Sequence, residues 1–186
     1  MKKIVNLLAT LSFLLFISPI SQAASCAVSD VTVDGANANE CRTHEGENND
    51  NYINDINTDF SLSSTYSWQE FKNDIPTNYS GSTSENGIGI SGDLTNGVWT
   101  FSGTLTDPFV IAIKASNSFA SYLFEGQQGA SNGTFKMIFE NKKGIPHDLS
   151  HFSIYTTVSN VPLPAALWLF APALLGFMGF RRKTKS

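Results

Sequence analysis

"FVIAIKASNSFASYLFEG", residues 109–126, is the stretch that decides the fold. In its first half, Phe109, Ile111 and Ile113 fall on one face of an extended chain. In its second half, 119–124, two alternating sets of side chains fall on opposite faces. A period of two with β-branched and aromatic residues is typical of β-strands, and Asn117 marks a turn. The stretch therefore predicts two strands joined by a short connection.

The same period recurs on both sides of this stretch. In "GTFKMIFE", residues 133–140, the predicted apolar face holds Phe135, Met137 and Phe139. In "HFSIYTTV", residues 151–158, it holds Phe152, Ile154 and Val158. Asn96-Gly97 is expected to form the hairpin turn between 88–94 and 98–105.

Short strands at a spacing of about ten residues indicate an all-β body, an antiparallel β-sandwich or a jelly-roll-like fold. A short helical piece is expected only within 61–74. The predicted organisation has three parts: a signal peptide at 1–23, an exported β-sandwich domain at 24–160, and a sorting signal with a transmembrane segment and basic tail at 161–186.

The beginning of the chain has the three parts of a secretory signal peptide. Lys2 and Lys3 are followed by an apolar run from Ile4 to Ile17 and by small residues at 21–23. This order predicts export, with cleavage after Ala23 or Ala24. The alternative is an N-terminal membrane anchor.

Charge is distributed unevenly along the chain. All sixteen Asp and Glu residues lie between Asp30 and Asp148, where only six Lys and Arg residues accompany them. Sixteen acids against six bases leave this body about ten negative charges, although the whole chain has a formal net charge of -4. An acidic body repels nucleic-acid phosphates, so no nucleic-acid partner is expected.

Cys26 and Cys41 are the only cysteines. Two cysteines in an exported chain favour a disulfide, which here would close a loop of about 15 residues. A metal-binding or redox pair is the weaker interpretation, because the spacing is too wide for a C-x-x-C motif.

The segment "EGENNDNYINDINTD", residues 45–59, is rich in acids and amides. Asp55, Asn57 and Asp59 resemble the start of a calcium loop, but Phe60 and Tyr66 occupy the positions that need Gly and Glu in an EF-hand. An EF-hand is excluded. We expect a solvated loop, with a calcium site of another type as the alternative.

Two clusters invite a catalytic or metal-binding interpretation. "HDLSH", residues 147–151, combines imidazole, carboxylate and hydroxyl groups, but no G-x-S-x-G motif accompanies it. Local clustering does not make a triad, so we expect a structural role at the start of the last strand. His44 with Glu45 and Glu47 lacks the spacing of a metal motif. No catalytic, cofactor-binding or metal-binding residue is assigned, and no cofactor is expected, with calcium kept as the exception.

Three large aromatic residues could form either core or a carbohydrate-stacking face. Trp68, Trp99 and Tyr122 lie within predicted strands. Such residues are more often core, and core is the expectation here. Paired carboxylates for glycoside hydrolysis stay open, because their separation depends on the fold.

The closing segment is a second hydrophobic element. Residues 161–180 carry no charge and would span about 30 Å as a helix. Arg181, Arg182 and Lys183 follow at once and are expected to stop transfer on the cytoplasmic side. The sequence predicts a transmembrane helix with the acidic body outside. An ordinary single-span anchor is one interpretation of this segment.

A more specific interpretation comes from the motif that opens it: Val161, Pro162, Leu163, Pro164 and Ala165. With Trp168 and the basic tail, it resembles the VPLPA variant of the PEP-CTERM sorting domain. The resemblance implies processing by exosortase, a membrane-embedded protease or transpeptidase of Gram-negative bacteria, and association with exopolysaccharide and biofilm. Ala171-Pro172 departs from the small residues usual there.

The body is similar to uncharacterised PEP-CTERM substrates in "GVWTFSG", "GTFKMIF" and "DLSHFSIYTTV". This similarity brings no active-site residues. The expected function is an exported surface or extracellular-matrix protein without enzymatic activity, anchored transiently and then placed at the cell surface or outside the cell. The alternatives are a secreted carbohydrate-active enzyme and a calcium-dependent carbohydrate-binding module.

Overall fold

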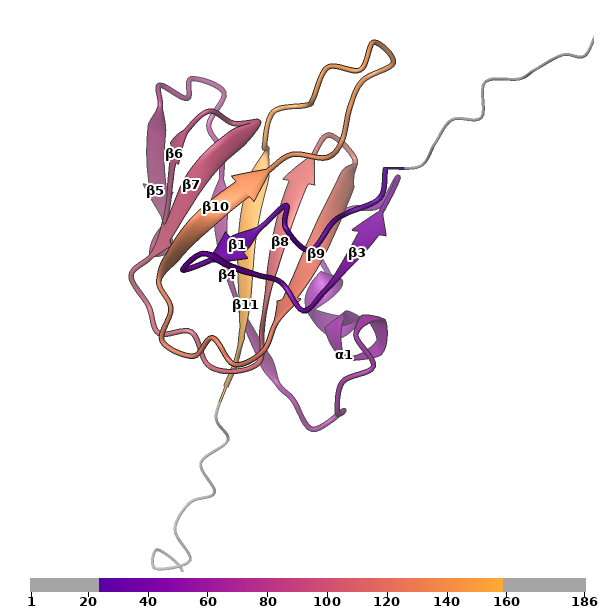
Figure 1. The fold of residues 1–186 in the computed structure, drawn as a ribbon, viewed down its shortest axis with the longest axis vertical. Helices are drawn as coiled ribbons and strands as arrows, with labels where there is room; N and C mark the ends of the chain where they lie inside the picture. Colours follow the sequence, from indigo (N-terminus) through magenta and orange to yellow (C-terminus); the bar gives the residue numbers. More distant parts are fainter. Residues whose placement is uncertain (1–23, 159–186) are drawn as a thin grey trace, which may run out of the picture.

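Two antiparallel sheets face each other in the computed structural model, which describes residues 24–158 (Figure 1). The first sheet has the order β10-β7-β6-β5: Asn132–Lys136, Asn96–Phe101, Ile88–Gly92 and Ser82–Glu85. The second has the order β3-β9-β8-β11-β4: Glu40–His44, Ser118–Phe124, Phe109–Ala115, His151–Thr157 and Trp68–Asp74. A small hairpin, β1 (Thr32–Val33) and β2 (Ala36–Asn37), lies beside β10. The predicted antiparallel all-β body is confirmed.

Strands β8 and β9 form the predicted hairpin at the centre of the larger sheet. Ala115 pairs with Ser118 next to the turn, and Phe109 pairs with Phe124 at the far end. Both strands are buried almost throughout. Apolar residues on both faces make this possible, because each face is covered by a different layer.

The main core lies between the sheets. Trp99 and Phe135 of the smaller sheet meet Phe109, Ile111 and Phe152 of the larger one, and all five are fully buried. Each such side chain contributes about 1.5–3 kcal/mol by leaving water. The predicted core positions of Trp99 and Tyr122 are therefore correct, whereas Trp68 is only half-buried.

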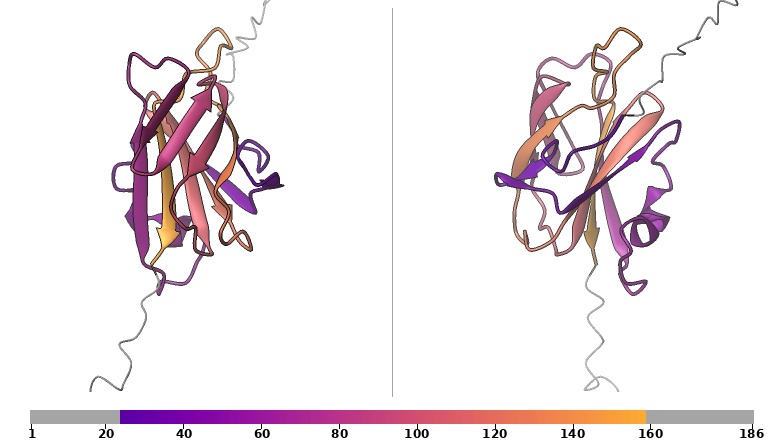
Figure 2. Two further views of the ribbon diagram at one scale, coloured as in Figure 1. Left: turned by 90° about the vertical axis from the view of Figure 1, so that its left-hand side faces the viewer. Right: turned by 45° about the vertical axis from the view of Figure 1, so that its right-hand side comes forward.

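A third layer covers the outer face of the larger sheet. It consists of η1 (Tyr52–Asn54) and α1 (Ile56–Asp59), which lie on the side away from the smaller sheet (Figure 2). Tyr52, Ile56 and Phe60 form a second buried cluster with residues of β8, β9 and β11. The predicted solvated loop is correct for most residues of 45–59, which are exposed, but it missed η1, α1 and the side chains of Tyr52 and Ile56, which pack against the sheet. The expected helical piece at 61–74 is also wrong, since β4 occupies half of that range.

The β6–β7 hairpin exists, but its turn is not Asn96-Gly97. Both residues belong to β7, and the turn lies at 93–95. There, Oδ1 of Asp93 accepts hydrogen bonds from the Thr95 N–H and hydroxyl, both at 2.7 Å. Gly97 is needed for a different reason: a Cβ there would come within 2.7 Å of the Phe135 ring.

Two of the predicted strand faces need correction. Met137 and Phe139 are buried as expected but lie beyond the end of β10 at Lys136. Val158 follows the end of β11 and is 39% exposed, so its predicted place beside Phe152 is wrong.

Cys26 and Cys41 form the predicted disulfide, which ties the segment before β1 to β3. The signal peptide at 1–23, the motif at 161–165, the hydrophobic segment to 180 and the basic residues 181–183 lie outside the described residues. Between residues 24 and 158, no helix is long and apolar enough to cross a membrane.

Candidate functional site: a groove between three loops

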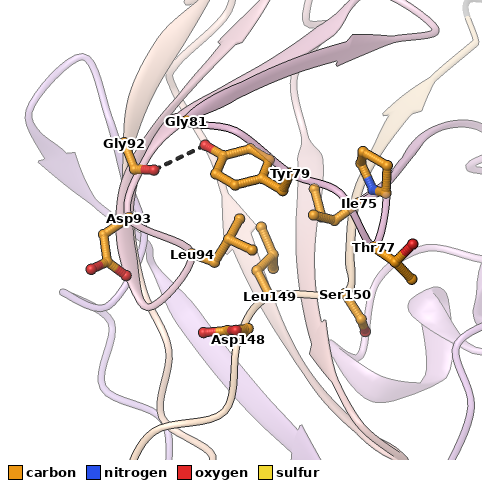
Figure 3. A pocket seen from close by; sticks show the side chains of 11 residues that line it. Ile75, Thr77, Tyr79, Gly81, Gly92, Asp93, Leu94, Asp148, Leu149 and Ser150 are labelled. Atoms are coloured by element: carbon orange, nitrogen blue, oxygen red, sulfur yellow. Dashed lines mark hydrogen bonds between the residues drawn. The ribbon is translucent and has the colours of Figure 1, made fainter.

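A groove of about 550 Å³ opens at the end of the sandwich where β11 begins. Three segments line it: 75–81 after β4, residues 92–94 at the end of β6 and in the turn to β7, and 148–150 before β11. Both sheets therefore contribute to it. We call it the Tyr79 groove, after the aromatic residue that lines it (Figure 3).

Main-chain hydrogen bonds fasten the three segments to one another. Each bond joins a different pair of segments: Gly92 N–H to the Gly81 carbonyl (3.0 Å), Leu149 N–H to the Leu94 carbonyl (3.0 Å), and Ile75 N–H to the Ser150 carbonyl (2.9 Å). The Tyr79 hydroxyl adds a fourth, to the Gly92 carbonyl at 2.9 Å. The groove is therefore set by the backbone of both sheets.

Apolar and polar side chains line different parts of the groove. Figure 3 shows Tyr79, Leu94 and Leu149 in the centre, with the carboxylates of Asp93 and Asp148 on one side. Leu149 is almost fully buried and belongs to the main core. The apolar floor is thus continuous with the interior of the protein.

The groove carries negative charge. The hydrogen bonds from Thr95 hold the pKa of Asp93 below its usual value, so Asp93 is ionised at neutral pH. Partial burial, with a smaller contribution from the Asp93 charge, raises the pKa of Tyr79. Between residues 24 and 158, the Asp148 carboxylate has no hydrogen-bond or ion-pair partner. The described lining includes no Lys, Arg or His side chain.

Ser150, at the rim of the groove, contacts the imidazole of His151. Ser150 Oγ lies 3.0 Å from His151 Nδ1, and His151 Nε2 lies 3.2 Å from Asp74 Oδ1. Ser150 Oγ also donates to the Lys114 carbonyl at 3.0 Å. The pKa of His151 is lowered, first by burial and then by the positive charge of Lys72. The structure thus joins part of the 147–151 cluster to a carboxylate on β4.

This arrangement contains the groups of a Ser-His-Asp relay. A hydrolytic serine needs free N–H groups to stabilise the oxyanion. The N–H groups of Ile75, Leu149 and Ser150 instead donate to main-chain carbonyls. These three N–H groups are therefore not available to stabilise an oxyanion.

A smaller pocket of about 250 Å³ lies over the third layer, beside the 45–59 segment. His44 is stacked on Phe119 with ring centroids 4.2 Å apart. Its Nε2 lies 3.2 Å from Asp59 Oδ2, and its Nδ1 lies 3.5 Å from Glu47 Oε2. Among the described residues, no three His, Cys, Asp or Glu side chains are placed to hold a metal ion.

The calcium-like triplet does not converge on one point. Asn57 donates to the Tyr66 carbonyl and accepts from the Trp68 indole, while Asp59 faces His44. Asp55 precedes α1 and makes no side-chain cap. Asn57 thus connects the third layer to Trp68 of β4, while Asp59 contacts β3.

Tyr79 and Asp93, central to the groove, were not singled out from the sequence. The available signal was Ile75-Pro76, since a proline after a strand indicates a loop, and loops at strand ends often carry function. That signal does not reveal which loops meet. Comparison with protein families, with curated proteins and with solved structures found no match.

Proposed function

We propose that this chain is an exported surface or extracellular-matrix protein, anchored transiently and processed by an exosortase. Residues 1–23 direct export through the inner membrane, and 161–180 hold the acidic body outside until cleavage near 161–165. The structural observation that supports export is the Cys26–Cys41 disulfide, because such bonds form in oxidising compartments. The order of motif, apolar segment and basic residues supports the sorting step.

The body acts without catalysis, as an adhesive or structural module near exopolysaccharide. The Tyr79 groove supports this role, because it combines an apolar floor with hydrogen-bonding groups and is fixed by both sheets. The N–H groups of Ile75, Leu149 and Ser150 already donate to main-chain carbonyls, which supports contact over bond cleavage beside Ser150.

A secreted hydrolase is the second candidate, favoured by the Ser150–His151 contact and by two carboxylates in one groove. It is tested with ester and glycoside substrates on the purified chain and its Ser150→Ala variant. We expect no turnover by either protein. Turnover that Ser150→Ala abolishes would establish the hydrolase instead.

The sorting proposal is tested by intact-mass analysis of the protein from cells with and without exosortase. We expect a C-terminus shortened near 161–165 only when exosortase is present. A variant with Pro162→Ala and Pro164→Ala is the matched control, because it alters the motif and leaves 161–180 apolar and without charge. An identical, unshortened C-terminus in both strains would refute processing, and full-length protein in the cytosol would refute export.

A further inference from the structure

We propose that the Tyr79 groove binds a polysaccharide of hexosamine units whose amino groups are free and positively charged. This inference deepens the proposed function and rests on it for one point only, that the protein encounters the polysaccharide outside the cell. Four features of the groove carry the inference: its surface chemistry, its charge, its preformed segments and its place in the fold.

Surface chemistry favours a sugar ring over a purely apolar ligand. The floor offers the half-buried side chains of Tyr79 and Leu94, on which the C–H face of a pyranose ring can lie. Thr77 and Ser150 place hydroxyl groups beside this floor. Apolar surface with polar groups at its margin is the usual composition of small-molecule sites.

Charge selects among sugars. Asp93 and Asp148 both line the groove, and the described lining holds no cation. Asp93 is fixed by Thr95 through Oδ1, which leaves Oδ2 free of those bonds. A protonated amine can pair with such carboxylates, whereas a uronic acid would be repelled. The excess of acids over bases in the body adds long-range attraction for a polycation.

The groove is formed before any ligand arrives. Hydrogen bonds connect all three of its segments, so binding requires little ordering of the loops. Low reorganisation matters for a shallow site, because a sugar unit gains few contacts with which to offset lost loop entropy.

The groove also lies far from the point where the chain leaves the body. β11 runs seven residues from His151 beside the groove to Thr157, a distance of about 20 Å. Val158 therefore lies at the opposite end of the sandwich (Figure 1). A body tethered through residues beyond 158 would direct the groove away from the membrane.

The experiment is a titration of the full chain in mild detergent with four hexameric probes. They are glucosamine, N-acetylglucosamine and galacturonate hexamers, and hexalysine. We expect binding by the glucosamine hexamer, weaker binding by its acetylated form, and none by galacturonate. Hexalysine tests whether charge alone suffices. Equal binding of the acetylated hexamer, or binding of hexalysine as tight as that of glucosamine, would overturn the inference.

Variants locate the site. Asp93→Asn and Asp148→Asn should each weaken glucosamine binding by about two- to fivefold, the range expected for exposed ion pairs. Tyr79→Ala removes the ring and should bind less well. Glu125→Gln removes an equal charge just after β9, at the Val158 end, and should have no effect. If Glu125→Gln weakens binding as much as Asp93→Asn, the groove is not the site.

The titration tests the ligand and the mass analysis of the C-terminus tests sorting, so either proposal can be refuted without the other. Lost sugar binding with intact processing refutes the ligand and leaves sorting in place. Sugar binding by a chain that exosortase does not process refutes sorting and leaves the groove as a binding site.

Discussion

Asn73 of β4 donates a hydrogen bond of 2.8 Å from its side-chain amide to the main-chain carbonyl of Ile88 in β6, so a polar contact links the two sheets inside the core. Asn73 is fully buried, and its Oδ1 has no partner in the described part of the chain. This hydrogen bond stabilises one relative position of the two sheets, because it forms only when Asn73 of β4 lies opposite Ile88 of β6.

Replacing Asn73 should therefore destabilise the fold. We expect Asn73→Ala to lower the free energy of unfolding by about 1–3 kcal/mol, because the Ile88 carbonyl loses a buried donor. Asn73→Asp should cost more, since a carboxylate would face that carbonyl. Urea unfolding measures both, with exposed Asn78→Ala as the control. A change no larger than that of the control would contradict a stabilising role.

Gly133 of β10 should not tolerate a side chain. A Cβ there would lie 1.8 Å from the Thr32 carbonyl oxygen and 2.8 Å from the Trp99 indole nitrogen. Gly133→Ala must push β1 away from β10, at a cost of about 1–3 kcal/mol. Thermal unfolding checks this, against Gln128→Ala on the exposed loop before β10. Equal melting temperatures for the two variants would show that β1 does not pack here.

The disulfide should supply a measurable share of the stability. Cys26 and Cys41 are 15 residues apart, and closing such a loop stabilises by about 3 kcal/mol in the chain-entropy model. A Cys26→Ser, Cys41→Ser double variant should unfold at correspondingly lower urea concentration. Reductant should shift the parent toward the variant and leave the variant unchanged. A parent insensitive to reductant would argue against the bond.

The free energy of unfolding should also fall in mild acid, because His151 becomes protonated. Burial lowers its pKa, so the folded state favours the neutral imidazole over the charged one. Its contribution is therefore present above the unfolded pKa of about 6.5 and is lost as pH falls through the lower folded value. His151→Gln should reduce the pH dependence of the unfolding free energy between about pH 7.5 and pH 5.5. An unchanged pH dependence of the unfolding free energy in His151→Gln would contradict this assignment.

Much of the sandwich could be predicted from short-range pattern. Residues 109–126 alternate so regularly that both faces of β8 and β9 follow from the sequence. The disulfide followed from the cysteine count. The Asn96-Gly97 turn failed because a strong local turn signal lost to a tertiary need: Asp93 caps the turn, and Phe135 needs the space at Gly97.

The third layer was missed although a signal existed. Tyr52, Ile56 and Phe60 recur every four residues, which is the spacing of one helix face, but acids and amides surround them. The Tyr79 groove is different in kind. Its three segments are distant in sequence, and only the register of β4, β6 and β11 brings their ends together. Local pattern does not contain that information.

The third layer has a practical consequence for anyone shortening the protein. Residues 45–62 resemble a dispensable hydrophilic insert, and trimming them would be a natural step toward a smaller version. Yet Val110, Phe119 and Tyr155 rely on this segment for their cover. The shortened protein would expose the apolar and aromatic outer face of the larger sheet to solvent, and it would aggregate.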